Sequence, residues 1–106
     1  MLHNIKNILS ELKNRLQIQY GERLAQIVLF GSQARGEATE NSDIDVMVVL
    51  KGDVSPSQEI ARTIYDVAEI SLINDVVLSC VFMPENRYKQ EESPLLLNVR
   101  REGMLI

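Results

Sequence analysis

Two short motifs place the residues most capable of chemistry close together in the sequence. Gly31 and Ser32 follow the apolar run Leu24–Phe30, and Asp43 and Asp45 lie at the opening of the next apolar run. A turn of small residues can present backbone N–H groups to phosphate oxygens. Side chains two apart on a strand point to the same face, so the two carboxylates should converge. The pattern therefore predicts a site for a nucleoside triphosphate and its magnesium ions.

The two carboxylates also have a structural explanation. Asp43 follows Ser42 and could simply close a turn. That explanation does not account for Asp45, a charged residue in an otherwise apolar strand. A buried, unpaired carboxylate costs several kcal/mol, and two carboxylates on one face repel unless a cation lies between them. A metal-binding pair is therefore the expected role.

The residues around the glycine-serine turn have distinct expected roles in nucleotide binding. Gly31 allows close approach of the backbone, and Ser32 could donate its hydroxyl to a phosphate. Arg35 could neutralise the triphosphate or fix the turn. Pairing of Arg35 with Glu37, Glu40 or Asp43 is an equally open alternative, since arginines near carboxylates usually pair.

Hydrophobic periodicity predicts the elements that position these motifs. Apolar residues at a spacing of three and four indicate an amphipathic helix from Leu2 to Tyr20. A second helix should start at Ser55-Pro56, with Ser55 as its cap, and run to about Ile73. Short, β-branched apolar runs are typical of strands. Three are present: Leu24–Phe30, Ile44–Leu50 and Asp75–Met83.

The remaining segments complete an α+β (α/β) domain. Glu85 to Glu92 suggests a helical turn, and Pro94 to Glu102 a short final helix. The apolar tail Met104–Ile106 either packs on the core or forms a partner surface. Helices interleaved with at least three strands predict a small mixed β-sheet packed by helices, in a single domain over residues 1–106.

Composition and charge exclude several classes of function. The chain has 106 residues, a net charge of -4, 45% hydrophobic residues and 25% charged residues. An acidic balance disfavours binding of long nucleic acid. The sequence has neither an apolar run of about 20 residues nor the layout of a signal peptide, so a cytoplasmic location is expected. The one cysteine, Cys80, excludes a disulfide within the chain and is expected in the core.

The segment Gly31-Ser32-Gln33-Ala34-Arg35-Gly36 with Ser42-Asp43-Ile44-Asp45 resembles the signature of the DNA polymerase β nucleotidyltransferase superfamily. The short length and the closing Arg101-Glu102-Gly103 resemble its minimal nucleotidyltransferases from bacteria and archaea. The resemblance implies a polymerase β-like fold and a third metal-binding carboxylate on a neighbouring strand. Asp75, at the opening of its run, has the position expected for that residue.

Nucleotidyl transfer gives these residues catalytic roles. Two magnesium ions roughly 4 Å apart can bridge the attacking oxygen, the α-phosphate and the leaving pyrophosphate. Asp43 and Asp45 would bind both ions, and Asp75 would hold the ion that activates the acceptor hydroxyl. Gly31, Ser32 and Arg35 would bind the nucleotide.

The resemblance also implies a partner. Minimal nucleotidyltransferases are typically paired with a small helical HEPN protein in toxin–antitoxin systems, and the HEPN toxin is an RNase. The chain would then be an antitoxin that transfers AMP from ATP to a tyrosine of the toxin, either as a hetero-oligomer with it or as a homo-oligomer. Three alternatives remain open: an antitoxin that blocks its partner by binding alone, a small-molecule nucleotidyltransferase, and an enzyme that modifies nucleic-acid ends. The last is disfavoured by the acidic balance and the few aromatic residues.

Overall fold

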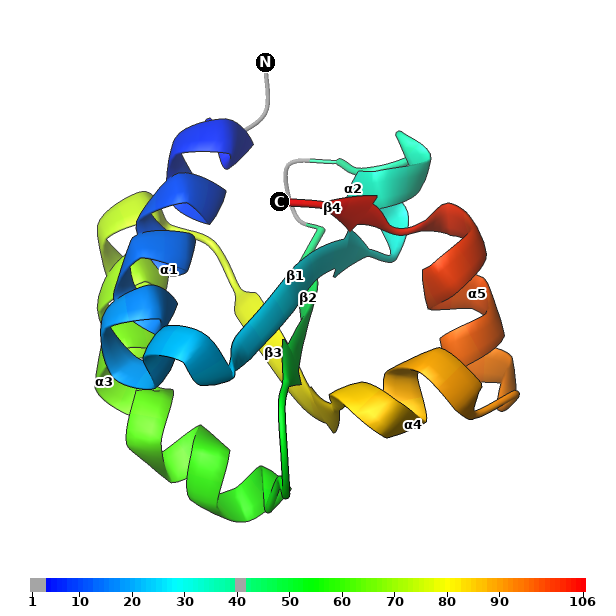
Figure 1. Ribbon diagram of the computed structural model, residues 1–106. Helices are drawn as coiled ribbons and strands as arrows, with labels where there is room; N and C mark the ends of the chain where they lie inside the picture. Colours follow the sequence, from blue (N-terminus) through cyan, green and yellow to red (C-terminus); the bar gives the residue numbers. More distant parts are fainter. Residues whose placement is uncertain (1–3, 40–41) are drawn as a thin grey trace.

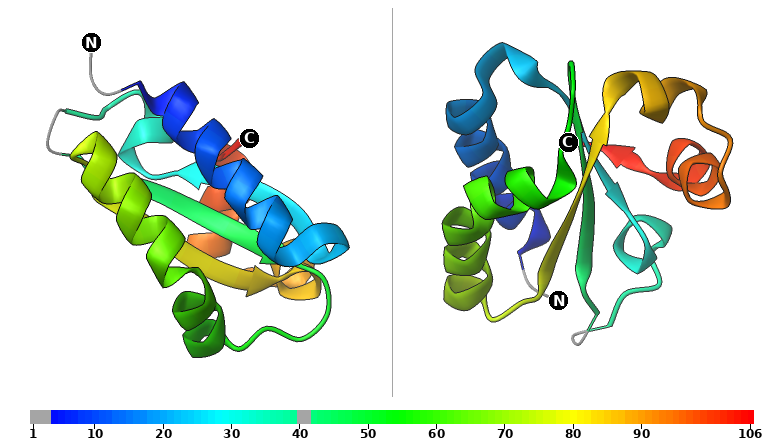
Figure 2. Two further views of the ribbon diagram at one scale, coloured as in Figure 1. Left: turned by 90° about the vertical axis from the view of Figure 1, so that its left-hand side faces the viewer. Right: turned by 90° about the horizontal axis from the view of Figure 1, so that it is seen from below.

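A mixed four-stranded sheet lies between two layers of helices (Figures 1 and 2). The computed structural model describes residues 4–39 and 42–106. The strand order is β3-β2-β1-β4, with β1 antiparallel to both β2 and β4 and with β2 parallel to β3. The strands are β1 (Leu24–Phe30), β2 (Ile44–Leu50), β3 (Leu78–Pro84) and β4 (Met104–Leu105).

The helices divide between the two faces of the sheet. Figure 1 shows α1 and α3 on one side of the strands and α4 and α5 on the other. A short helix, α2, connects the end of β1 to the loop before β2. The helices are α1 (Ile5–Tyr20), the 3-10 turn η1 (Gly21–Arg23), α2 (Ser32–Arg35), α3 (Pro56–Asn74), α4 (Glu85–Gln90) and α5 (Pro94–Glu102). Among the described residues, no helix has the length and apolar character needed to cross a bilayer.

Alternation along β2 sends side chains into two separate cores. Val46 and Val48 pack in the larger core, together with the buried face of α1. Met47 and Val49 point to the opposite face and pack with buried residues of α4 and α5. Because successive strand residues face opposite sides, β2 is covered on both faces, which explains why it is apolar almost throughout. Asp45 is the charged exception.

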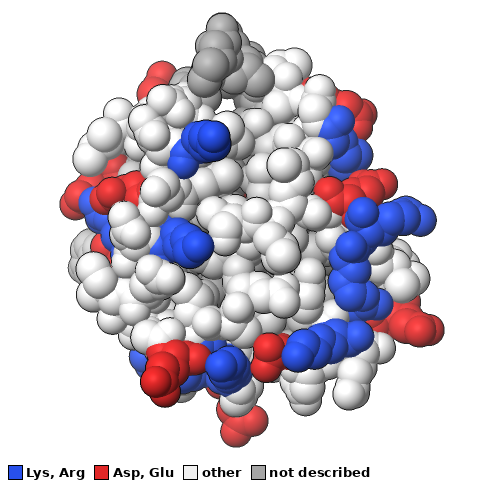
Figure 3. All heavy atoms as spheres, turned by 45° about the horizontal axis from the view of Figure 1, so that its top comes forward, with Lys and Arg blue, Asp and Glu red and all other residues white. Residues whose placement is uncertain are grey.

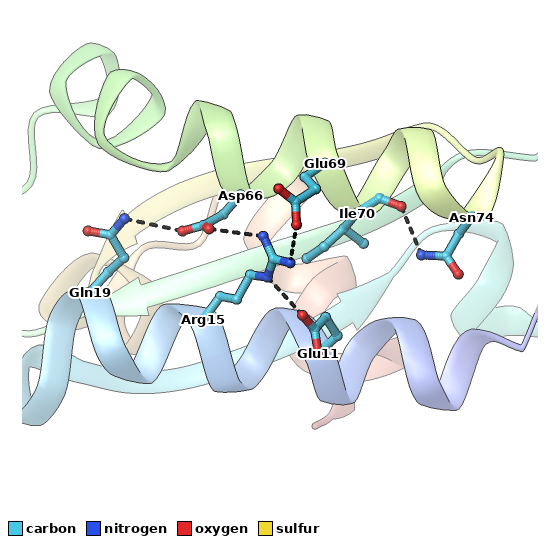
Figure 4. A network of polar contacts seen from close by, with 7 residues as sticks. All are labelled: Glu11, Arg15, Gln19, Asp66, Glu69, Ile70 and Asn74. Carbon is cyan, nitrogen blue, oxygen red and sulfur yellow. Dashed lines mark hydrogen bonds and ion pairs between the residues drawn. The ribbon is translucent and has the colours of Figure 1, made fainter.

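Polar contacts connect α1 to α3 on the outer side of the larger core (Figure 4). The Arg15 guanidinium on α1 contacts Glu11 Oε1 at 2.8 Å, Asp66 Oδ1 at 3.1 Å and Glu69 Oε1 at 2.6 Å. Gln19 adds a hydrogen bond to Asp66 at 3.2 Å. Two of the three ion pairs cross between the helices, so the network fixes the position of α3 along α1.

A buried hydrogen bond joins the end of α1 to the start of α3. The Tyr20 hydroxyl donates to Glu59 Oε1 at 2.8 Å, and the Glu59 side chain is almost fully buried. Arg62 Nε lies 3.6 Å from the same oxygen. Glu59 therefore has both a hydrogen-bond donor and a positive charge beside it, as a buried carboxylate requires.

The structure confirms the predicted fold class and most element boundaries. β1, β2 and α5 have the predicted bounds, and α3 extends one residue beyond Ile73. α1 ends at Tyr20 as predicted, whereas the predicted start at Leu2 lies outside the described residues. Ser55 occupies the predicted cap position of α3, but its side chain makes no capping hydrogen bond.

One predicted strand boundary was wrong, and one strand was not predicted. The third strand begins at Leu78, not at Asp75, because the chain first leaves α3 through a left-handed turn. The apolar tail was expected to pack on the core or to form a partner surface, and Ile106 does pack against the larger core. Met104 and Leu105 also form β4, a strand that was not predicted, which pairs with Leu29 and Val28 of β1.

Candidate functional site

The turn after β1 places two backbone N–H groups at the start of α2. Gly31 has φ 73° and ψ -156° and precedes the helix. Its carbonyl accepts hydrogen bonds from the N–H groups of Ala34 at 3.1 Å and Arg35 at 3.2 Å. The first N–H groups of a helical turn have no carbonyl partner within the helix. Those of Ser32 and Gln33 are therefore the groups that a phosphate could contact.

Asp45 lies directly against this turn. It is paired with Phe30 at the end of β1, and its side chain is partly exposed. A Cβ atom at Gly31 would lie 2.5 Å from Asp45 Oδ2. The structure thus brings the carboxylate to the backbone of the glycine-serine turn, although the two residues are 14 positions apart in the sequence.

The surroundings of Asp45 disfavour the ionised form of its carboxyl group. Burial raises the pKa of the Asp45 carboxyl above its usual value, and the negative charge of Asp43 raises it further. The positive charge of Arg35 acts in the opposite direction but is the smallest of the three effects. A cation between the two carboxylates would relieve both costs.

Asp43 lies at the open end of the site. It is exposed and precedes the first residue of β2. The Ser42 hydroxyl, beside it in the chain, accepts a hydrogen bond from the Thr39 N–H at 2.8 Å. The charge of Asp43 acts on Asp45, and Asp45 lies against Gly31. Asp43 and Asp45 therefore form an interacting pair of carboxylates, of which Asp45 contacts the turn.

Arg35 pairs with a neighbouring carboxylate. Its Nε donates to Glu37 Oε1 at 2.6 Å, and its Nη1 lies 3.9 Å from Glu102 Oε2. Within residues 4–39 and 42–106 no ion pair joins it to Asp43, and Glu40 lies outside the described residues. Of the expected pairings of Arg35, the ion pair with Glu37 is thus the one present. Arg35 still acts on the site through its charge near Asp45.

Asp75 does not occupy the position expected of a third carboxylate. It is exposed and caps the C-terminus of α3 in a left-handed conformation, with φ 52° and ψ 50°. Its N–H donates to the Leu72 carbonyl at 3.4 Å. Aspartate tolerates this conformation better than most residues, so Asn74-Asp75 serves as the turn out of the helix. β3 begins three residues later.

The strand position beside Asp45 belongs instead to Ser79. The parallel register of β2 and β3 pairs these two residues directly, so their side chains share one face of the sheet. Across the described part of the chain, no three His, Cys, Asp or Glu side chains are grouped so as to hold a metal ion. Asp75 is therefore not brought together with Asp43 and Asp45.

The sequence analysis did not identify Ser79. The alternation of Leu78, Cys80 and Phe82 toward the larger core does indicate that Ser79 faces the other side. Its position beside Asp45, however, depends on the direction and register of two strands, and these do not follow from the pattern.

The donor set fits a hard divalent cation bound together with a nucleotide. Magnesium takes one or two protein carboxylates and completes its coordination with phosphate oxygens and water. Asp43 and Asp45 supply those carboxylates, and the adjacent turn supplies N–H groups for the phosphates. A second ion would need a further protein ligand, and a serine lies where that ligand would be.

Known proteins resemble this chain in sequence and in fold. A protein of Methanocaldococcus jannaschii named "Putative protein adenylyltransferase MJ1305" is 34% identical over 96 residues, which cover 91% of this chain and 56% of that protein. The protein adenylyltransferase MntA of Thermococcus cleftensis is 45% identical over 47 residues, which cover 44% of this chain and 46% of MntA. The chain thus spans about half the length of these relatives.

A solved structure extends the similarity to the fold. A crystal structure of a toxin-antitoxin with AMP-PNP matches with a TM-score of 0.66 and 20% identity, over 91% of this chain and 69% of that one. At this identity the match shows the fold alone. Residues 5–100 also match the family model of the nucleotidyltransferase domain. That match covers α1 through most of α5, including the turn and both carboxylates, and the chain therefore belongs to the nucleotidyltransferase domain family.

Proposed function

We propose that the protein is a magnesium-dependent nucleotidyltransferase that transfers AMP from ATP to a hydroxyl group of a partner protein. The observation that supports this most strongly is the approach of the Asp45 carboxylate to the Gly31 backbone. It joins a phosphate-binding turn to a carboxylate pair. The names of the two protein adenylyltransferase relatives favour a protein acceptor over a small molecule.

In this proposal Asp43 and Asp45 hold one magnesium ion together with the triphosphate. Magnesium at this pair supplies positive charge to the phosphate oxygens as negative charge develops on them. Asp75 is left outside the site because it caps α3. The second ion expected from the sequence is left out because Ser79, and not a carboxylate, is paired with Asp45.

The turn binds and orients the triphosphate. The N–H groups of Ser32 and Gln33, with the Ser32 hydroxyl, donate to β- or γ-phosphate oxygens. Gly31 keeps the space between the turn and Asp45 free of a side chain. Arg35, held by Glu37 at 2.6 Å, fixes the far end of α2 and contributes positive charge.

The transfer is an in-line displacement at the α-phosphorus. The acceptor oxygen forms a bond to this atom while the bond from phosphorus to the bridging α–β oxygen breaks. Pyrophosphate leaves with that electron pair, and the acceptor proton passes to water. Ser79, and not a carboxylate, adjoins Asp45 on β3, so the proposal assigns the proton to water.

The proposed partner is the toxin of a toxin–antitoxin pair. The solved structure with a similar fold is a toxin-antitoxin that contains an ATP analogue, which supports both ATP as the nucleotide and a toxin as the partner. The resemblance to minimal nucleotidyltransferases adds the remaining details: a HEPN RNase as the toxin, a tyrosine as the acceptor, and the cytoplasm as the location.

Labelling of the partner tests the proposal. The chain is mixed with the product of its neighbouring gene, magnesium and ATP labelled at the α-phosphate, and label on the partner is measured after denaturing electrophoresis. We expect labelling that is lost in Asp43→Asn and in Asp45→Asn and is kept in the control Asp53→Asn, because Asp53 lies in the loop after β2. Labelling that persists in the Asp43→Asn/Asp45→Asn double variant would contradict the mechanism.

A second function, neutralisation of the toxin by binding alone, is favoured by one observation. The site has a serine where a third carboxylate was expected. An antitoxin of this kind would bind the toxin without labelling it, and the double variant would still protect cells from the toxin. Loss of protection in the double variant would favour transfer.

A further inference from the structure

A groove of about 530 Å³ lies on the side of the molecule formed by α1 and β4. Its floor and walls include Leu9, Leu29 and Met104, and its end meets Gln33 of α2. The Leu29 side chain belongs to the larger core, so the groove lies on the face of the sheet opposite Asp45. It is therefore separate from the proposed metal site.

The charged residues that line the groove are both basic. Lys6 and Lys13 lie along α1 on one wall, and neither forms an ion pair with any residue in the described part of the chain. Figure 3 shows a face with uncharged atoms across its centre and with Lys or Arg atoms on both sides of them, and Asp or Glu atoms toward its margins. In a chain of net charge -4, two lysines beside an apolar groove are complementary in charge to an acidic segment.

β4 adds an open strand edge to the groove. The strand order places β4 at the edge of the sheet. The Ile106 N–H donates to the Ile27 carbonyl at 3.0 Å, so by alternation the N–H and C=O of Leu105 point away from β1. Met104 is 54% exposed and Leu105 is 71% exposed. Among residues 4–39 and 42–106, no strand pairs with the outer edge of β4, and an edge of this kind with exposed apolar side chains is a template for an added strand.

We propose that this surface binds an extended, acidic segment of a partner protein, which adds a strand beside β4. The segment would hydrogen-bond with the Leu105 backbone, place apolar side chains over Leu9 and Met104, and direct carboxylates toward Lys6 and Lys13. Backbone pairing supplies the affinity in this mode of recognition, and side-chain contacts supply the specificity. The proposal does not depend on the transfer reaction, because it uses the opposite face of the sheet.

Peptide titration tests the proposal. The probe is an eight-residue peptide of valine and leucine with two glutamates, and the matched peptide has two lysines in their place. Amide chemical shifts of the isotope-labelled chain are followed during titration with each peptide. We expect the acidic peptide to shift the amides of β4 and of the first half of α1, and to bind at least tenfold more tightly than the basic peptide.

Variants locate the binding. Lys6→Glu/Lys13→Glu should reverse the preference between the two peptides, whereas Lys51→Glu, in the loop after β2, should leave it unchanged. Leu105→Pro should weaken binding, because it removes only the outward N–H and proline is tolerated on an edge strand. The amide spectrum of each variant reports whether its fold is retained.

Four results would overturn the proposal. The first is a failure of the acidic peptide to bind, and the second is equal binding of the two peptides. The third is a shift of the β4 amides that depends on protein concentration without peptide, which would identify a second copy of the chain as the occupant of the groove. The fourth is displacement of the peptide by ATP, which would identify the nucleotide as the occupant.

Discussion

The Oδ2 atom of Asp45 lies where a side chain at Gly31 would begin, 2.5 Å from the position of its Cβ. This contact joins the end of β1 to the start of β2 and leaves no room for any residue but glycine. It also places the negative charge of Asp45 beside a turn whose first N–H groups have no carbonyl partner within α2 and therefore suit an anion. A cation that binds both Asp45 and a phosphate on the turn would neutralise the repulsion between these two negative charges.

Gly31→Ala should destabilise the fold more than Gly36→Ala does. Gly36 is in the left-handed α region (φ 73°, ψ 19°), where alanine costs roughly 1–2 kcal/mol. Gly31 (φ 73°, ψ -156°) lies in a region that is essentially restricted to glycine, so its backbone cost is already the larger one. In addition, a Cβ atom at Gly31 would collide with the Asp45 side chain, whereas nothing lies within 4 Å of a Cβ atom at Gly36. Urea denaturation of both variants measures the difference. Equal losses of stability would contradict both the stricter backbone requirement at Gly31 and the steric contact of its Cβ position with Asp45.

Asp45→Asn should raise the free energy of unfolding at pH 7 in the absence of divalent cations. Burial and Asp43 raise the pKa of Asp45 in the folded chain, so the folded state binds the proton more tightly than the unfolded state. The resulting stabilisation is fully present below the unfolded pKa of about 3.9 and is lost as pH rises through the raised folded value.

The gain from Asp45→Asn should therefore shrink as pH falls toward 4. Urea denaturation between pH 4 and pH 8 in a chelator checks this trend. Asp53→Asn, in the exposed loop after β2, is the control and should show no such trend. A variant that is less stable than the wild type at pH 7 would contradict the inferred cost of the Asp45 charge.

Ser79→Asp should create a stronger divalent cation site. A carboxylate paired with Asp45 across two strands adds like-charge repulsion, so the variant should be less stable than the wild type in a chelator. Magnesium or manganese should restore more stability to it than to the wild type, because ligands that bind only the folded state stabilise it. Thermal unfolding with and without metal measures this.

Ser57→Asp, at an exposed position near the start of α3, is the matched control for Ser79→Asp. It introduces the same charge far from the carboxylate pair and should show no added response to metal. An equal metal response in the two variants would contradict the placement of Ser79 beside Asp45.

Tyr20→Phe should lower the free energy of unfolding by about 1–3 kcal/mol, because it leaves the buried Glu59 carboxylate without its hydroxyl donor. Tyr65→Phe is the control, since Tyr65 is 86% exposed and its loss should change stability by less than about 0.5 kcal/mol. Chemical denaturation compares the two. An unchanged stability in Tyr20→Phe would mean that Arg62 alone is sufficient for Glu59.

Local pattern was sufficient to predict the elements that surround the site. The β-branched runs of β1 and β2 and the apolar spacing of α1 and α3 are strong signals, and the glycine-serine turn with Asp43 and Asp45 lies between two such elements. These residues could be predicted to meet because the motif itself connects adjacent strands.

The residue that lies beside Asp45 on β3 could not be predicted in the same way. Asp75 was assigned to a strand because it precedes an apolar run, but left-handed capping after α3 competes with strand formation for an Asn-Asp pair. The neighbour of Asp45 is set by pairing between strands separated by α3. That pairing is a tertiary property, and it selects Ser79. β4 was missed for a similar reason, since two residues are too few to show an alternation.

The central claim is that Asp43, Asp45 and the Gly31 turn together hold a magnesium-bound nucleotide. Calorimetric titration of the chain with ATP, in magnesium and again in a chelator, tests it most directly. The account predicts binding that requires magnesium, that weakens at least about tenfold, or 1.4 kcal/mol, in Asp45→Asn, and that is unchanged in Asp53→Asn. Binding of equal strength in the Asp43→Asn/Asp45→Asn variant, or in the chelator, would contradict it.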